Sequence, residues 1–186
     1  MIKLLLDVPC ITIQIKNKDY MNNKVKDIIR LAIVSAMYVL FTVINPFSYN
    51  AIQFRISEIL MILCFFRKDY SIALTIGCLI SNFFSGFMLY DIIFGTLATI
   101  LACLCIIFSK NIYVSIIYPI LFNSLLVGFE LYLVTDVSFE LNALYVGIGE
   151  TVVMIVGLII FIKLRKNNHF LELIKANQNI NIKTSS

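Results

Sequence analysis

The chain has 186 residues, of which 60% are hydrophobic and only 14% are charged. Soluble domains carry roughly 45–50% apolar residues even with glycine included, and about 25% charged residues. A globule of this length cannot bury so much apolar surface, so the composition excludes soluble enzymes, nucleic-acid binders and disordered scaffolds. The formal net charge of +4 is less informative than the positions of the lysines and arginines. We predict an all-α integral membrane protein.

Residues 1–20 form an N-terminal extension for which the sequence predicts no structural role. The apolar run Leu4–Leu6 is interrupted by Asp7, which is atypical of a signal peptide. Met21 is therefore a candidate for the natural start of the protein.

Six segments are apolar enough to be membrane helices, since a span needs roughly 20 mostly apolar residues. In chain order they are Lys26–Ile44, Ile52–Phe66, Tyr70–Phe87, Tyr90–Phe108, Ile112–Val134 and Leu144–Leu164. The second segment is short, which indicates that its outer end lies within the protein rather than in lipid. Together the spans make a membrane domain over residues 21–166. The polar tail, residues 167–186, is expected to be a loosely ordered cytoplasmic end.

The lysines and arginines lie in alternate connections, which sets the predicted orientation. They precede the first span, follow the second and fourth, and close the sixth, as Lys24, Lys26, Arg30, Arg67, Lys68, Lys110, Lys163, Arg165 and Lys166. The opposite connections contain no lysine, and Arg55 alone lies near them. We therefore expect a multi-pass protein of the cell membrane with both termini in the cytoplasm.

Polar side chains inside the predicted spans mark a candidate binding site. Each charge in a span costs roughly 2.5–3.5 kcal/mol on insertion scales, so such residues usually have a function. Most of them fall in the outer halves of five helices, which predicts a pocket open to the outside. The set is Gln53, Arg55, Glu58, Asn82, Asp91, Asn123, Glu130 and Glu150.

Some of these residues also have purely structural explanations. Arg55 and Glu58 are three positions apart and can form an internal salt bridge on one helix face. Asp91 can cap the helix that begins at its position. Glu150 is the hardest to explain structurally, because it lies inside an apolar, glycine-containing run.

The charge balance of the set indicates the kind of ligand. Four carboxylates against Arg55 favour a cation or a ligand rich in hydrogen-bond donors. The two oxygens of a carboxylate match the paired N–H groups of a guanine-like edge. Aromatic residues at similar depth, Tyr49 and Tyr132 among them, can stack on a flat ring, although tyrosines also form the ordinary aromatic belt of membrane proteins.

Residues for catalysis are missing from the sequence. His169 is the single histidine and lies in the polar tail, which leaves no histidine-based dyad or zinc site in the membrane. No phosphate-binding loop of the G-x-x-x-x-G-K-[ST] type is present either. We expect no catalytic residue, metal or cofactor, so any transport must be energised by a gradient or by another subunit.

Small residues on the first span make a possible contact surface. Ala32 and Ala36, with Ser35 between them, form a ridge of the small-xxx-small type, which lets another backbone approach closely. The ridge can serve packing within the bundle or the docking of another protein.

The run Tyr49-Asn50-Ala51-Ile52-Gln53-Phe54-Arg55-Ile56-Ser57-Glu58 resembles the signature of the QueT family of queuosine-precursor transporters. Members of that family are substrate-binding (S) components of energy-coupling-factor (ECF) transporters. Further similar runs are Asp91–Thr99, Gly128–Tyr132 and Gly149-Glu150. Asn50 stands where the family is expected to have glycine. Asparagine can replace glycine at such a position because it also adopts positive φ.

The resemblance implies a six-helix S component that captures a 7-deazaguanine, such as 7-aminomethyl-7-deazaguanine, at its outer face. It also implies docking onto a membrane coupling protein with two ATPase subunits, with the Ala32–Ala36 ridge as the contact. Glu130 or Glu150 would accept hydrogen bonds from the guanine edge and another carboxylate would meet the amine, an assignment that stays open. The alternatives are an S component for a different vitamin and an accessory membrane subunit without a transport role.

Overall fold

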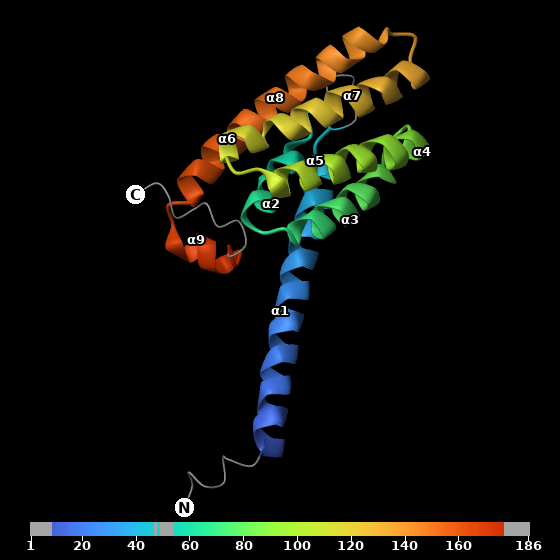
Figure 1. Cartoon of the computed structure of the whole chain (residues 1–186). Helices are drawn as coiled ribbons and strands as arrows, with labels where there is room; N and C mark the ends of the chain where they lie inside the picture. Colours follow the sequence, from blue (N-terminus) through green and yellow to red (C-terminus); the bar gives the residue numbers. More distant parts are fainter. Residues whose placement is uncertain (1–8, 47, 49–53, 177–186) are drawn as a thin grey trace, which may run out of the picture.

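The computed structural model describes residues 9–46, 48 and 54–176, and this part of the chain is built from helices (Figure 1). In chain order they are α1 (Pro9–Ile44), the 3₁₀ helix η2 (Ile56–Ile62), α2 (Leu63–Phe66), α3 (Tyr70–Asn82), α4 (Met88–Tyr90), the π-helix η3 (Asp91–Gly95), α5 (Thr96–Phe108), α6 (Ile112–Ser115), α7 (Ile117–Val134), α8 (Phe139–Leu164) and α9 (Asn168–Leu173). The predicted all-α fold class is confirmed.

Within the described residues, four helical stretches are long and apolar enough to cross a membrane: Asn23–Ile44, Met88–Phe108, Ile112–Val134 and Phe139–Leu164. They correspond to the first, fourth, fifth and sixth predicted spans. The second and third predicted spans correspond to the shorter apolar helices Ile56–Phe66 and Tyr70–Asn82. The second helix is therefore short, as the sequence predicts.

Several predicted boundaries differ from the structure: the first helix begins at Pro9, the second at Ile56 and the fourth at Met88. The third helix ends at Asn82 rather than at Phe87, and α8 begins at Phe139 rather than at Leu144. The polar residue Asn142 suggests a break in the sequence, but its side chain folds back and donates hydrogen bonds to Val137 O at 3.1 Å and to Thr135 Oγ1 at 3.3 Å. The asparagine thus ties the first turns of α8 to the connection before it, and the helix starts earlier than its polarity predicts.

Glycines set two close helix contacts in the bundle. A Cβ on Gly128 of α7 would lie 2.7 Å from the Ala143 Cα of α8. A Cβ on Gly77 of α3 would lie 2.9 Å from the Tyr38 Cβ of α1. Small residues at helix crossings allow backbones to approach in membranes, where packing replaces the hydrophobic effect between helices. The antiparallel α7–α8 pair and the α1–α3 pair are visible in Figure 1.

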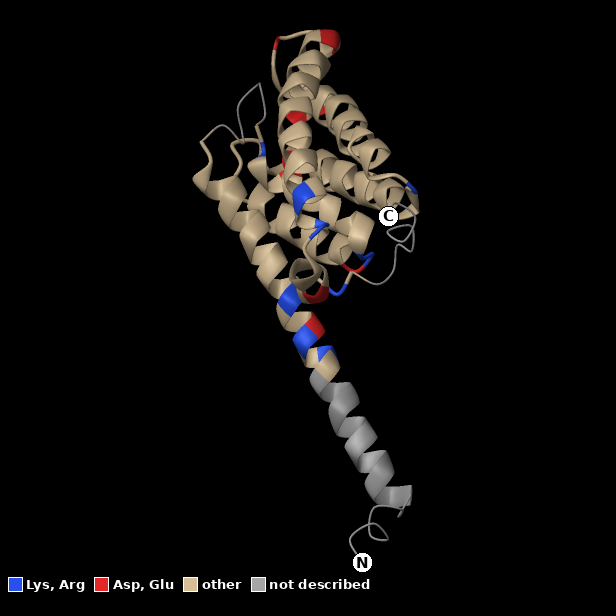
Figure 2. Cartoon of the chain, turned by 90° about the vertical axis from the view of Figure 1, so that its left-hand side faces the viewer, with Lys and Arg blue, Asp and Glu red and all other residues tan. Residues whose placement is uncertain are grey.

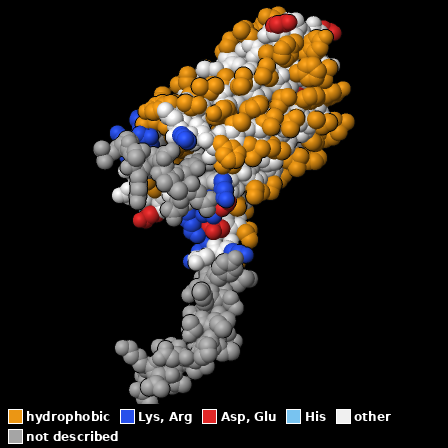
Figure 3. All heavy atoms as spheres, in the orientation of Figure 1, with side chains coloured by type: hydrophobic (Ala, Val, Ile, Leu, Met, Phe, Trp, Pro, Cys, Tyr) orange, Lys and Arg blue, Asp and Glu red, His pale blue; other side chains and the backbone are white. Residues whose placement is uncertain are grey.

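The outer surface of the bundle is apolar. Hydrophobic side chains cover most of the bundle face shown in Figure 3, and Ile28, Leu89, Ile93 and Phe108 are each more than 60% exposed. Such a continuous apolar exterior would be unstable in water but suits lipid tails. Together with the four long apolar helices, it identifies a multi-pass membrane protein.

Charged residues are concentrated near the ends of the bundle (Figure 2). Most lysines and arginines gather at the end where α9 lies, where Asp27 and Asp69 pair with some of them, whereas the opposite end, at the α7–α8 connection, carries acidic residues. Asp136 and Glu140, which belong to this connection and to the first turn of α8, are both exposed. This distribution fits the pattern from which the sequence predicts the orientation.

The chain after α8 is packed, which the sequence does not predict. In α9, the Phe170 ring lies 6.1 Å from the Phe161 ring and 6.4 Å from the Phe66 ring, measured between centroids. Ile174 is buried, and its carbonyl accepts a hydrogen bond from the Tyr70 hydroxyl at 3.1 Å. The prediction of a loosely ordered tail is therefore wrong for residues 167–176. Apolar residues spaced through this polar segment supply the contacts.

Candidate functional site

Seven of the predicted site residues come together inside the bundle, and each is at most 3% exposed. We call them the polar cluster: Arg55, Glu58, Asn82, Asp91, Asn123, Glu130 and Glu150. They come from the start of η2 and from α3, η3, α7 and α8. Gln53 and Tyr49 lie outside the described residues. The convergence of polar groups that the sequence predicts is therefore present for these seven.

Irregular helix geometry places two of these residues. Arg55 immediately precedes the 3₁₀ helix η2, and the Glu58 N–H donates to the Arg55 carbonyl at 2.9 Å, so a tight turn presents both side chains at one end of the helix. Asp91 begins the π-helix η3 within the continuous helical stretch Met88–Phe108. Single turns of π-helix occur frequently at functional sites.

One half of the cluster is an ion pair. The Arg55 Nη2 atom lies 2.8 Å from Asp91 Oδ1, and both side chains are at most 4% exposed. The Arg55 Nε–H also donates to the Ser48 carbonyl at 3.3 Å, and the Ser85 hydroxyl donates to Asp91 Oδ2. Asp91 does not cap the helix, because it lies after α4 and its side chain bonds to Arg55 and Ser85. The N-cap explanation is therefore wrong.

Asn82 and Gly95 support this ion pair. The Asn82 Nδ2 atom donates to the Asp91 carbonyl at 2.7 Å, which satisfies an acceptor in the π-helical turn. A Cβ on Gly95 would lie 3.1 Å from Asn82 Nδ2 and 3.4 Å from Arg55 Nη1. Gly95 thus leaves space for both side chains. Sequence reasoning missed Gly95 and Ser85 as parts of the site, although both lie within six residues of Asp91.

The other half of the cluster contains two adjacent carboxyl groups. Glu58 accepts a hydrogen bond from Asn123 Nδ2, which joins η2 to α7. The Glu58 carboxyl also interacts directly with the carboxyl of Glu150 on α8. Two neighbouring carboxylates repel each other when both are ionised, and a cation placed between them relieves the repulsion.

Several polar atoms of the cluster have no hydrogen-bond partner among the described residues. They are both carboxylate oxygens of Glu130, Oε1 of Glu150 and Oδ1 of Asn82. A buried polar group without a partner costs about 1–3 kcal/mol, and more when it is charged. Groups of this kind in a membrane interior are ready to bind a ligand that supplies donors.

The predicted aromatic residue Tyr132 lies apart from the polar cluster. Its side chain is 49% exposed, and its ring contacts that of Phe129 at 6.2 Å between centroids. Phe129 also contacts the rings of Phe94 and Phe139, at 5.8 and 6.4 Å. Tyr132 therefore belongs to an aromatic group on the outside of the bundle, as expected for an aromatic belt.

The small-residue ridge lies on the surface of the bundle. Ala32 and Ala36 are exposed and Ser35 is partly buried. The three residues line an open groove of about 460 Å³ between α1 and α3, together with Ile72, Ala73, Ile76 and Ile80. The two alanines are thus accessible from outside the bundle at this groove.

No group of three or more histidine, cysteine, aspartate or glutamate side chains suited to a metal ion occurs within residues 23–46, 48 and 54–176.

Comparison with known proteins identifies the relatives of this chain. A family model described as "QueT transporter" matches residues 28–166. A protein of Lactococcus lactis subsp. cremoris (strain MG1363), named "Queuosine precursor transporter QueT", is 49% identical over 81 residues. That match covers 42% of this chain and 47% of the relative, so it spans about half of the relative's length. No solved structure matches the chain.

Proposed function

Because the chain belongs to the QueT transporter family, we propose that it is the substrate-binding (S) component of an ECF-type importer for a queuosine precursor of the 7-deazaguanine class. The observation that carries this proposal is Glu130, a fully buried carboxyl group beside that of Asp91, whose two oxygens accept no hydrogen bond from a donor among the described residues. A buried acceptor of this kind is costly unless a ligand binds to it. ATP hydrolysis would take place in partner subunits.

Glu130 and the Glu58–Glu150 pair suit two different parts of such a ligand. The free oxygens of Glu130 can accept the two parallel N–H groups of a guanine edge, because a carboxylate binds paired donors in bidentate fashion. The adjacent carboxyls of Glu58 and Glu150 suit the protonated aminomethyl group. The Arg55–Asp91 ion pair, which is already satisfied within the protein, would hold these acceptors in place.

The proposed orientation has six membrane segments with both termini in the cytoplasm. Two features support this orientation. Most lysines and arginines lie at the α9 end of the bundle (Figure 2), and positive residues favour the cytoplasmic side of a membrane. In addition, Arg55 and Glu58 lie at the start of η2, whereas Arg67 and Lys68 follow the end of α2. The polar cluster would then open toward the outside of the cell.

The open groove between α1 and α3 is the proposed contact with the membrane coupling protein. Ala32 and Ala36 are exposed on it, with Ser35 beside them. Small residues on a lipid-facing helix allow a second helix to pack closely. An exposed ridge of this type fits the docking surface that the family resemblance implies.

The experiment that tests this proposal is calorimetric titration of the purified protein with 7-aminomethyl-7-deazaguanine. Glu130→Gln and Glu150→Gln are each expected to weaken binding at least tenfold, which corresponds to about 1.4 kcal/mol. Glu140→Gln is the matched control, because Glu140 is exposed at the start of α8. The 7-cyano analogue lacks the charged amine, so Glu150→Gln is expected to weaken its binding less than that of the amine.

The same titration separates the alternatives. Saturable binding of another vitamin, with the deazaguanines inactive, would keep the S-component role and change the substrate. No binding of any heterocycle by folded protein would favour the accessory-subunit alternative.

A further inference from the structure

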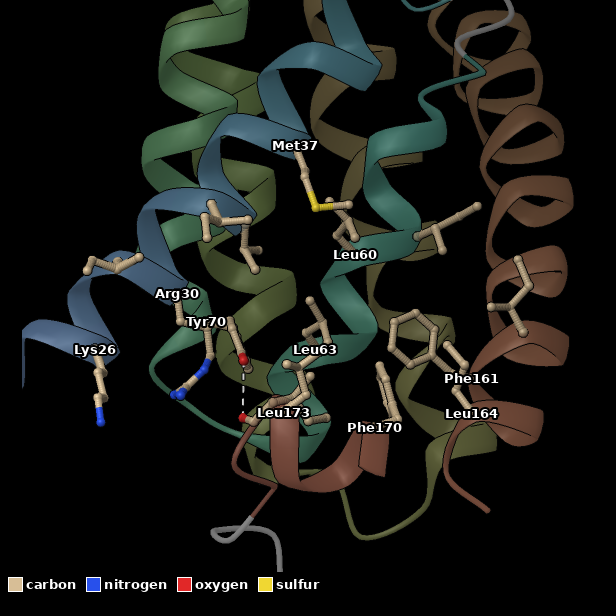
Figure 4. A pocket seen from close by; sticks show the side chains of 16 residues that line it. Lys26, Arg30, Met37, Leu60, Leu63, Tyr70, Phe161, Leu164, Phe170 and Leu173 are labelled. Carbon is tan, nitrogen blue, oxygen red and sulfur yellow. Dashed lines mark hydrogen bonds between the residues drawn. The ribbon is translucent and has the colours of Figure 1, made fainter. Parts of the chain in front are cut away.

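A second cavity lies at the α9 end of the bundle (Figure 4). It has a volume of about 530 Å³, which is within the range of small-molecule pockets. Its walls are α1 on one side and α8 on the other, with η2 and α2 behind, and Phe170, Leu173 and Ile174 of the α9 segment close one end. We call it the α1–α8 groove.

The α1–α8 groove opens toward lipid. The apolar side chains at its edges remain accessible: Ile29 and Ile33 on α1 are 52% and 55% exposed, and Ile160 on α8 is 41% exposed. Deeper in the groove, Leu63 and Phe161 are buried. The lining is almost entirely hydrocarbon, so the groove suits an extended apolar chain.

The end of the groove near α9 is positively charged. Lys26 and Arg30 line this end of the groove from one face of α1, one helical turn apart. Arg30 pairs with Asp27 at 2.7 Å. The same Asp27 carboxylate also contacts Lys175 at 2.9 Å and Arg67 at 3.4 Å.

This network leaves an excess of positive charge at the groove. Among the described residues, Arg30, Arg67 and Lys175 share Asp27, and Asp69 pairs with Arg67 at 2.6 Å. With Lys26 included, four cations face two carboxylates. The excess lies where the hydrocarbon lining ends, which is where a lipid headgroup meets the membrane surface.

From this combination we propose that the α1–α8 groove is a binding site for one anionic phospholipid. One acyl chain lies between α1 and α8 against Ile33 and Phe161, and the phosphate meets Lys26 and Arg30. Basic pockets between membrane helices bind anionic headgroups in this way. The proposal depends on the membrane location of the chain and not on the nature of the transported substrate.

Native mass spectrometry of the full chain in detergent, titrated with phosphatidylglycerol or phosphatidylcholine, tests the site. We expect phosphatidylglycerol to bind about fivefold more tightly than phosphatidylcholine. This preference should be lost in Lys26→Gln and in Lys26→Gln/Arg30→Gln. Lys110→Gln should retain it, because Lys110 is an exposed cation after α5 that does not line the groove. Equal binding of the two lipids, or a preference unchanged in the double variant, would overturn the proposal.

A second measurement identifies the occupant in native membranes. A photoreactive benzoylphenylalanine in place of Ile33 should form an adduct with the mass of one phospholipid. An adduct with another polypeptide, whether a second copy or a partner subunit, would show that a protein helix fills the groove and would refute the lipid site.

Discussion

The Arg55–Asp91 ion pair is expected to stabilise the fold whether or not a ligand is bound, and this stabilising role can be measured separately from ligand binding. Its atoms are 2.8 Å apart and both side chains are at most 4% exposed. Removing one partner of a buried pair leaves an uncompensated charge and costs about 3–5 kcal/mol. For a chain of this size each kcal/mol lowers the Tm by about 2–4 °C. Asp91→Leu should therefore lower the Tm by about 6–20 °C, with or without ligand.

Thermal unfolding in detergent, followed by circular dichroism, measures this effect. The double variant Arg55→Met/Asp91→Leu should recover most of the lost Tm, because well-packed apolar residues can replace a buried ion pair at little cost. The control is Asp69→Asn, which removes one charge from a 2.6 Å contact in which the Asp69 and Arg67 side chains are 32% and 12% exposed. Water screens this partly exposed pair more than the Arg55–Asp91 pair, so its loss should cost about 1 kcal/mol. If the double variant is as unstable as the two single losses combined, the two charges do not stabilise each other and the reasoning fails.

Three further outcomes are expected. Gly128→Ala places a methyl group against the α8 backbone, so it should lower the free energy of unfolding by about 1–3 kcal/mol. Gly86→Ala is the control, because a Cβ on Gly86 has no neighbour within 4 Å and should change the Tm little. Equal effects of the two variants would contradict the close α7–α8 contact. Phe170→Ala should lower the Tm more than Leu173→Ala, since Phe170 packs against two rings while Leu173 is 63% exposed; protease digestion of the C-terminal segment provides a second measurement. Ala36→Leu should leave the Tm unchanged but weaken co-purification of the coupling protein, and unaltered co-purification would place that contact elsewhere.

Much of the fold could be predicted from hydropathy, because a membrane allows few kinds of backbone. The fifth predicted span, Ile112–Val134, matches the structure at both ends. The predicted helix boundaries are wrong where a polar residue forms hydrogen bonds inside the protein instead of marking the end of a helix. Asn142 looks like the end of a segment but lies within α8, because its amide bonds to the preceding connection.

The composition of the candidate site could be predicted, but its internal pairing could not. Seven buried polar residues were found from the cost of placing polar groups in lipid. Helical spacing brings Arg55 close to Glu58, yet the salt bridge that forms is with Asp91, 36 positions later in the chain. Which carboxylate pairs with Arg55 depends on how η2 and η3 pack against each other. The spacing of residues along one helix does not predict this packing. The packing of Phe170 was missed for the same reason, because its partners are distant in sequence.

The sharing of Asp27 among three cations has a consequence for how the protein is assembled. Asp27 and Lys175 are separated by 148 positions, so their contact cannot form until α8 has been synthesised and inserted. Until then Asp27 can pair with Arg30 of its own helix and with Arg67, both of which are made earlier. The contact between the α9 segment and α1 is therefore a late event in biogenesis, and it forms after the last long helix has taken its place across the groove from the first.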